Sequence, residues 1–449
     1  MNTVKLFSVL LSILFLSACN NNKDNKTATN NEGYSKVETY EYPTDSIRIN
    51  KWVSEGNFKA MYKHSWNIWK HLTDSLKGGK LRYQTWASPT QIVNKLNNPS
   101  GNENTETLFE KPHQFTHHNP DFVTDDLSIV VTVGYNKASE KFAIDNKIFY
   151  LSSLQKMQTG PYSKIPDFPS DAINIKPVYK IITEDKVYDG MYTMSAWNGP
   201  KSYDDGYPQS KWKSCIHVNI NEKKNNPSGR LDYACDDINN NNTFYLDDFI
   251  HFKISKKQAA SYNQQINNAD VKAKEGDIAL LVAMHVTTKE IKRWTWQTYW
   301  WSPTPLNPRN PSSNAIASSK NGIALEGAAP HYAMAVAYSM ITPSQPYING
   351  KNEGNPLIAF NPYLEAHFGK FGSDSYVMNN GSKINTNLGV DSNCMSCHMV
   401  AAIDTKKGSS FNGPSYQGDK YTSYKDPELE NRLMLDFAWS IQGNLQTSK

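Results

Sequence analysis

The chain has 449 residues, a formal net charge of only +4 and 20% charged residues. A charge this small for the length argues against a nucleic-acid partner, and no basic run of the kind that binds nucleic acid occurs. Aromatic residues make up 12% of the chain, which is ample for a large core. The length exceeds that of one typical domain, so two packed units and one large β-rich body are both compatible with it.

The chain begins with the pattern of an exported lipoprotein. Lys5 precedes an apolar run from Leu6 to Leu16, which predicts a secretory signal peptide over residues 1–18. The run is too short for a membrane helix of about 20 residues. The sequence Leu-Ser-Ala-Cys resembles the bacterial lipobox, which implies that Cys19 becomes the first mature residue and carries acyl chains. Ordinary signal cleavage that leaves Cys19 as a free thiol is the alternative.

A lipid-modified cysteine predicts a protein that is anchored to a membrane and does not span it. Asn20 stands where an aspartate is often linked with inner-membrane retention, and this favours the outer membrane. We therefore expect a protein of the cell envelope that faces the periplasm. Residues 19–34 are rich in Asn, Lys and Thr and predict a flexible tether.

Residues 35–270 are predicted to form an N-terminal α+β region. Apolar residues spaced by three and four predict helix between Asp45 and Leu76, and Ser88 begins another helix. Mixed helix is expected over 137–158. Strands are expected at 81–86, 127–133, 172–182, 187–197 and 212–220. The segments 172–182 and 187–197 are separated by four residues, which predicts a hairpin.

Residues 271–449 are predicted to form a C-terminal β-rich region. Segments 278–287 and 291–301 are expected to pair as antiparallel strands, and 294–301 contains four tryptophans in eight residues. In a strand, Trp294, Trp296 and Thr298 point to one face, while Thr295, Gln297 and Tyr299 point to the other. The tryptophans predict either a core strand or one wall of a cofactor pocket. Asp426-Pro427 predicts the start of a closing helix that carries Met434.

Near the C-terminus, Cys394-Met395-Ser396-Cys397-His398 matches Cys-x-x-Cys-His, the attachment signature of a c-type haem. The thiols of Cys394 and Cys397 would form thioethers with the haem vinyl groups, and His398 would be the proximal iron ligand. Haem attachment requires export, which the N-terminus predicts. A zinc half-site and a thiol redox pair are the alternatives. Zinc would need two more ligands, and the chain has no second Cys-x-x-Cys.

The distal side of the predicted haem has no outstanding ligand. The candidates are His331, His285, Met334 and Met434. A histidine or methionine there gives an electron-transfer haem, whereas an open side gives a haem that binds a small ligand or reacts. Both alternatives stay open.

Two further cysteines, Cys215 and Cys235, remain once Cys19, Cys394 and Cys397 are assigned. In an oxidising compartment they predict a disulfide, which would contribute about 3 kcal/mol by constraining the unfolded chain. Two buried free thiols are the alternative.

Several segments together resemble large exported proteins that carry one C-terminal c-type haem motif. They are His64-Ser65-Trp66-Asn67-Ile68-Trp69, Thr85-Trp86, Lys176-Pro177-Val178-Tyr179, residues 294–301, Asn361-Pro362-Tyr363-Leu364-Glu365 and Ser392-Asn393-Cys394 onward. This resemblance covers most of the mature chain and implies no particular reaction.

The segment Asp436-Phe437-Ala438-Trp439, placed after a late haem motif, is similar to the cytochrome c′-beta group, which implies a β-sheet fold. Lysine-crosslinked relatives of that group oxidise hydroxylamine. No crosslinking lysine is assignable in this chain, so hydroxylamine chemistry is not implied.

Together these patterns predict an α+β fold, with a β-rich body of antiparallel sheets, peripheral helices and one covalent haem c near the C-terminus. The expected function is that of a membrane-anchored c-type cytochrome in electron transfer or haem redox chemistry, with a periplasmic redox partner. The alternative is a non-catalytic binding lipoprotein whose haem is structural or senses a gas. Whether the protein is an enzyme is left open.

Overall fold

A computed structural model describes most of the chain after residue 40. The described residues are 41–99, 106–112, 129–199, 207–227, 229–230, 234–266, 272–343, 354–366, 375–377, 383–385, 393–408, 412–414 and 420–447. The predicted signal peptide, Cys19 and the tether lie outside them. Helices and antiparallel sheets are mixed, so the predicted α+β class is confirmed. Within the described ranges, no helix has the length and apolar character needed to cross a membrane.

The largest sheet has seven strands in the order β1–β3–β9–β10–β11, with β2 beside β3 and β8 beside β9. Its bounds are β1 (Ile129–Val131), β2 (Gly134–Tyr135), β3 (Ile173–Ile182), β8 (His251–Lys253), β9 (Ile278–Thr288), β10 (Thr295–Trp301) and β11 (Tyr332–Ala337). The predicted antiparallel pairing of 278–287 with 291–301 is confirmed by β9 and β10. Residue 270 is the predicted boundary between the two regions of the chain. The central sheet combines strands from before and after it, because β3 pairs with β9.

Two helices, α1 (Ser46–Ser54) and α2 (Phe58–Thr73), cover one face of the central sheet. They confirm the predicted helix, with a break at Gly56, whose φ of 62° ends α1. The Tyr299 hydroxyl donates to the Ser65 carbonyl oxygen at 2.5 Å, and the Trp69 ring stacks on Tyr299 at 4.3 Å between centroids. These contacts place α2 on the face that Thr295, Gln297 and Tyr299 share.

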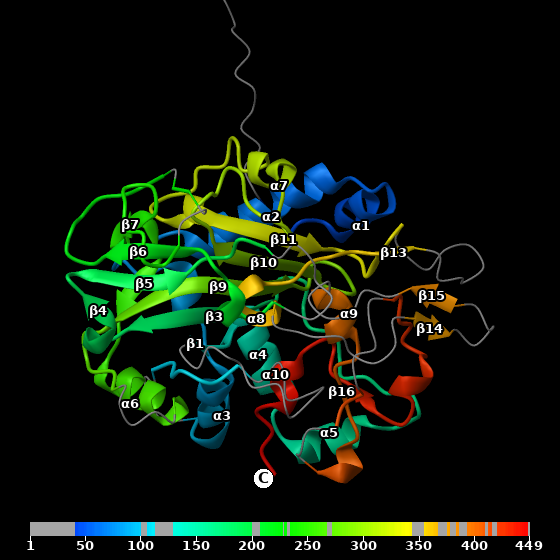
Figure 1. The fold of residues 1–449 in the computed structure, drawn as a ribbon. Helices are drawn as coiled ribbons and strands as arrows, with labels where there is room; N and C mark the ends of the chain where they lie inside the picture. The colour runs from blue at the N-terminus through cyan, green and yellow to red at the C-terminus, as the bar shows by residue number, and fades with distance from the viewer. Residues whose placement is uncertain are drawn as a thin grey trace, which may run out of the picture. The chain divides into compact units, whose positions relative to one another are not determined.

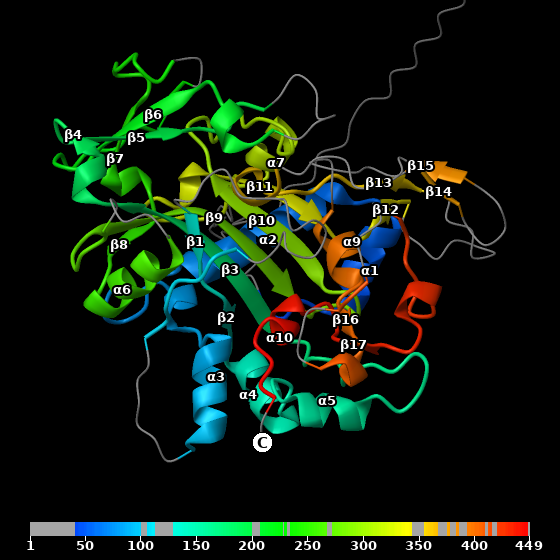
Figure 2. The same ribbon diagram turned by 60° about the horizontal axis from the view of Figure 1, so that its bottom comes forward.

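The opposite face of the sheet carries α8 (Pro362–Glu365) and α9 (Cys394–Met399). Asn361 Nδ2, next to α8, donates to Thr298 Oγ1 at 2.7 Å, and the Trp296 ring lies 4.4 Å from that of His398 in α9. Figures 1 and 2 show α2 and α9 on opposite sides of the sheet. The predicted alternation is confirmed for the residues of β10, whereas Trp294, which was expected in the same strand, lies before β10 and has a φ of 63°.

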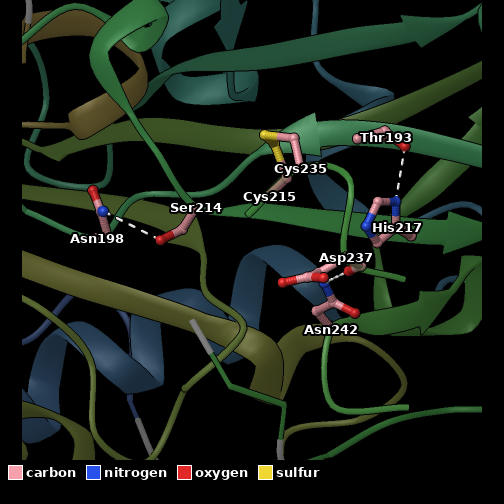
Figure 3. The surroundings of a disulfide bond; sticks show 8 residues. All are labelled: Thr193, Asn198, Ser214, Cys215, His217, Cys235, Asp237 and Asn242. Carbon is pink, nitrogen blue, oxygen red and sulfur yellow. Dashed lines mark hydrogen bonds between the residues drawn. A yellow bond between two sulfur atoms is a disulfide. The ribbon is translucent and has the colours of Figure 1, made fainter. Parts of the chain in front are cut away.

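A second sheet has four strands in the order β4–β5–β6–β7, and only its β6–β7 pair is parallel. The strands are β4 (Val187–Tyr188), β5 (Met191–Ser195), β6 (Cys215–Asn219) and β7 (Thr243–Tyr245). The predicted disulfide between Cys215 and Cys235 is present and ties β6 to the segment before β7 (Figure 3). Beside it, a hydrogen bond of 2.8 Å joins Thr193 in β5 to His217 in β6.

Four local predictions are wrong. The strand expected at 187–197 is divided into β4 and β5, which pair with each other across a turn at Asp189 and Gly190. Residues 172–197 do not form a hairpin, because β3 and β4 belong to different sheets and a 3₁₀ turn, η2 (Glu184–Lys186), joins them. The strand expected at 81–86 is a 3₁₀ helix, η1 (Arg82–Thr85), whose first turn is closed by the Gln84 side chain. The closing helix is replaced by η7 (Pro427–Leu429), β17 (Leu433–Met434) and α10 (Trp439–Gln442). Asn431, Asp436 and Phe437 have positive φ, which interrupts any helix there.

The remaining elements are short or peripheral. They are α3 (Pro89–Asn97), α4 (Lys137–Asn146), α5 (Leu151–Met157), α6 (Lys256–Gln265), α7 (Asn314–Ser318), η3 (Gln209–Lys211), η4 (Leu246–Asp248), η5 (Ala329–His331), η6 (Thr405–Lys407), β12 (Ile341–Thr342), β13 (Asn355–Pro356), β14 (Ser375–Val377), β15 (Lys383–Asn385) and β16 (Ala402–Ile403). Helix α3 confirms the predicted start at Ser88, which caps it.

Candidate cofactor site

The Cys-x-x-Cys-His motif forms the short helix α9, which is anchored by the residue before it. Asn393 caps α9, because its Oδ1 accepts hydrogen bonds from the backbone N–H groups of Met395 at 2.9 Å and Ser396 at 3.2 Å. Its Nδ2 donates to the Leu357 carbonyl oxygen at 2.8 Å. The helix therefore has a fixed position against the segment that precedes α8.

Cys394 and Cys397 are three positions apart in α9, so their side chains lie on the same side of the helix. They are not joined in a disulfide. Cys394 Sγ lies 3.2 Å from the Ala359 carbonyl oxygen, and Trp439 Nε1 donates to the Cys397 carbonyl oxygen at 3.2 Å. The motif is thus held from both sides by residues outside it.

His398 is oriented by a single backbone group. Its Nδ1 lies 2.7 Å from the Phe437 carbonyl oxygen, and because a carbonyl oxygen only accepts, Nδ1 carries the proton. In the neutral ring the lone pair then lies on Nε2. Burial lowers the pKa of His398 to about 3, so the imidazole is neutral near pH 7. Histidines that bind metals commonly donate their other N–H to a carbonyl in this way.

The Phe437 carbonyl is itself held by an unusual backbone. Asp436 has φ of 48° and Phe437 has φ of 70°, a conformation that costs non-glycine residues about 1–3 kcal/mol each. The Asp436 carboxylate accepts from Lys289 Nζ at 2.7 Å and from the Phe168 N–H at 3.1 Å. These contacts keep the strained turn in place beside His398.

A cavity of about 360 Å³ opens beside His398 and Cys397. This volume lies within the range of roughly 300–1,000 Å³ that is usual for ligand and cofactor pockets. Trp296 from the sheet and Phe437 and Trp439 from the closing segment give it aromatic walls. Both alternatives predicted for the tryptophan-rich strand, core and pocket wall, apply, each to different residues. Trp296 lines the cavity, whereas Trp301 stacks on Phe249 at 4.2 Å in the core.

The sheet supplies polar groups to the floor of this cavity. Lys176 in β3 pairs in register with His285 in β9, and both side chains line the cavity. His285 Nε2 donates to Glu365 Oε1 at 2.9 Å, and the Asn361 N–H donates to Glu365 Oε2 at 2.5 Å. Burial lowers the pKa of Lys176 to about 8, against the attraction of Glu365 and Glu110.

The four candidate distal ligands lie in different places. His285 is among the described residues that line the cavity, and the other three are not. His331 Nε2 lies 3.1 Å from Asp248 Oδ1, Met334 is buried in β11, and Met434 is in β17. The structure therefore brings His285 together with Cys397 and His398, and leaves His331, Met334 and Met434 apart from them.

Sequence reasoning missed Lys176 and Glu365 as site residues, although both lie in segments that it quoted. A signal was present, because Lys176 and His285 are polar residues inside strands that are otherwise largely apolar.

Across the described ranges, no group of three or more His, Cys, Asp or Glu side chains is arranged to hold a metal ion. No known family model matches the sequence, and no curated protein or solved structure matches it.

Proposed function

We propose that the protein is a c-type cytochrome, with one haem attached to Cys394 and Cys397 and with His398 as its proximal ligand. The observation that carries this proposal is the orientation of His398 within a complete attachment motif. Its Nδ1–H donates to the Phe437 carbonyl oxygen, which leaves Nε2, with its lone pair, as the nitrogen suited to bind a metal.

The surroundings of the motif support the same proposal. A haem needs a largely apolar pocket, and the cavity beside α9 has Trp296, Phe437 and Trp439 among its lining residues. When bound, the haem supplies an iron that changes valence and, if one side is open, takes a small ligand. The chain's own residues would orient His398, exclude water with aromatic walls, and present Lys176 and His285 to the same space.

In this proposal the protein acts in electron transfer or haem redox chemistry at the cell envelope. Cys19 would carry the lipid anchor, the outer membrane is the favoured site, and the partner is a periplasmic redox protein. A non-catalytic protein with a structural or gas-sensing haem is the second candidate. One observation favours it: His285 Nε2 donates to Glu365, and the other ring nitrogen, Nδ1, is buried and does not face the cavity, which argues for a haem with an open side.

The test is covalent haem attachment. The protein is produced in a bacterial strain that carries the cytochrome c maturation system, and haem is detected after denaturing electrophoresis. The wild type should retain haem, and Cys394→Ser and Cys397→Ser should each weaken attachment. Cys215→Ser is the matched control, because it removes a cysteine that lies outside the attachment motif and should keep the haem. Loss of haem from the denatured wild type would refute the proposal.

The two candidates are separated by the spectrum of the purified protein. A six-coordinate iron that ignores carbon monoxide and has a reversible potential indicates electron transfer. A high-spin iron that binds carbon monoxide without turnover indicates sensing.

A further inference from the structure

Lys176 and His285 are the two ionisable side chains that the middle strands of the sheet bring to the cavity, beside the polar Asn174 and Thr287. Lys176 and His285 are directly opposite each other on β3 and β9, and each strand has neighbours on both sides. Most residues of these strands are buried, yet Lys176 and His285 are only partly so, since they face the cavity. A partly solvated lysine beside a histidine is an uncommon floor for a cofactor pocket, whose walls are usually apolar.

His285 is held in a fixed orientation. Its side chain is 15% exposed, and its Nε2 donates to Glu365 Oε1 at 2.9 Å. Glu365 is fixed in turn, because its other oxygen accepts the Asn361 N–H at 2.5 Å. For His285 to bind iron through Nε2, this hydrogen bond would have to break and leave a buried carboxylate without its partner, which is costly. The other ring nitrogen, Nδ1, is buried and does not face the cavity. The geometry therefore argues against His285 as an axial ligand and makes it a fixed wall of the cavity beside Lys176.

Lys176 places a cation in the same space. An ammonium group donates up to three hydrogen bonds, and such bonds are strengthened where neighbouring walls are apolar and water is scarce. Glu110 and Glu365 are the carboxylates that act on Lys176, and Asp436, which also lines the cavity, is engaged by Lys289. The floor of the cavity thus combines the partly buried ammonium group of Lys176 with a fixed imidazole.

We propose that Lys176 and His285 form a recognition site for a small ligand with hydrogen-bond-accepting oxygen or nitrogen atoms, bound at the haem. The class includes nitrogen oxides, oxygen species and small anions. This inference rests on the proposed c-type cytochrome and adds that the distal side is open. Lys176 recognises the ligand by a charge-assisted hydrogen bond, and the fixed His285 restricts the ligand's orientation.

The first test uses the wild-type holoprotein, so it does not depend on any variant folding. The oxidised protein should bind cyanide, and the reduced protein should bind carbon monoxide. A covalent haem that is six-coordinate and inert to both probes would overturn the recognition site while the proposed cytochrome stands. A protein with no covalent haem would overturn the cytochrome itself, so the two failures are distinguishable.

The second test compares variants by cyanide titration and by the infrared stretch of bound carbon monoxide. Lys176→Met should weaken cyanide binding about tenfold, which is about 1.4 kcal/mol, and should move the carbon monoxide stretch to higher frequency. Lys176→Arg keeps the charge and should keep most of the affinity. Lys111→Met is the matched control, since Lys111 is an exposed lysine at the same cavity. Equal losses in Lys176→Met and Lys111→Met would overturn the proposal.

His285→Phe tests whether His285 is an axial ligand. In this proposal His285 is not an iron ligand. The spin state of the variant should therefore match that of the wild type, while the carbon monoxide stretch should shift. A change from low spin to high spin in His285→Phe would identify His285 as an axial ligand and overturn the proposal.

Discussion

The turn that orients His398 depends on one buried ion pair, and we expect Lys289→Met to break it. Lys289 Nζ lies 2.7 Å from Asp436 Oδ1, with side-chain exposures of 4% and 0%. Removing one partner of such a pair leaves the other charge buried, at a cost of about 3–5 kcal/mol. That is a large share of the total stability of an ordinary protein, which is about 5–15 kcal/mol.

The stability lost in Lys289→Met should depend on pH in a defined direction. Burial raises the pKa of Asp436, and Lys289 opposes that rise. An acid with a raised pKa in the folded protein binds its proton more tightly there than in the unfolded chain. Stability therefore falls as the pH rises from the ordinary value of 3.8 towards the folded pKa. Without Lys289 the folded pKa is higher still, so the gap between wild type and variant should be small in acid and widest near neutrality.

Urea unfolding across this pH range measures both effects, and Lys164→Met is the matched control. Lys164 and Lys289 both pair with Asp167, but Lys164 is 21% exposed and Asp167 is 49% exposed. A surface pair of this kind contributes about 0–1 kcal/mol. If Lys164→Met and Lys289→Met destabilised the protein equally, or if the Lys289→Met loss did not change with pH, the assigned role of the buried pair would be refuted.

Three further predictions concern other parts of the fold. Cys235→Ser, measured without reductant, should lower the free energy of unfolding by about 3 kcal/mol, because it removes the constraint on the unfolded chain. Burial alone would raise the pKa of Glu290, but His64 lowers it overall. Its stabilising effect should therefore be lost as the pH falls below the ordinary value of 4.5, and Glu290→Gln should lose its difference from wild type there. At Gly413 a Cβ would lie 2.7 Å from an indole ring, so Gly413→Ala should cost about 1–3 kcal/mol, whereas Gly160→Ala meets no atom within 4 Å and should not. Comparable thermal shifts in the two alanine variants would contradict the packing account.

Local patterns predicted the elements whose causes are local. Helices α2 and α3 follow from apolar spacing and from side-chain caps, and β9 and β10 follow from their composition and a short connection. The hairpin expected from β3 to β4 failed because β3 pairs instead with β9, almost 100 residues later. Connection length alone cannot show that a more distant strand competes for the same edge.

The helix predicted for the closing segment was wrong for a different reason. A proline after a capping aspartate predicted a helix, but Asn431, Asp436 and Phe437 take positive φ, which composition does not reveal. Those backbone angles are set by tertiary contacts, such as the Lys289 pair and the hydrogen bond from Phe168. The departure from the helical prediction lies at the site itself, where the Phe437 carbonyl meets His398.

Three side chains at the site are positioned by groups far from them in the sequence. The capping Asn393 binds the Leu357 carbonyl, the His398 ring binds the Phe437 carbonyl, and His285 binds Glu365. A motif of five residues therefore identifies the attachment point but contains none of the groups that set its geometry. A histidine whose tautomer is fixed before any cofactor arrives pays less entropy on binding a metal. The same reasoning applies to the cavity, since Glu365 fixes the His285 ring before any ligand binds.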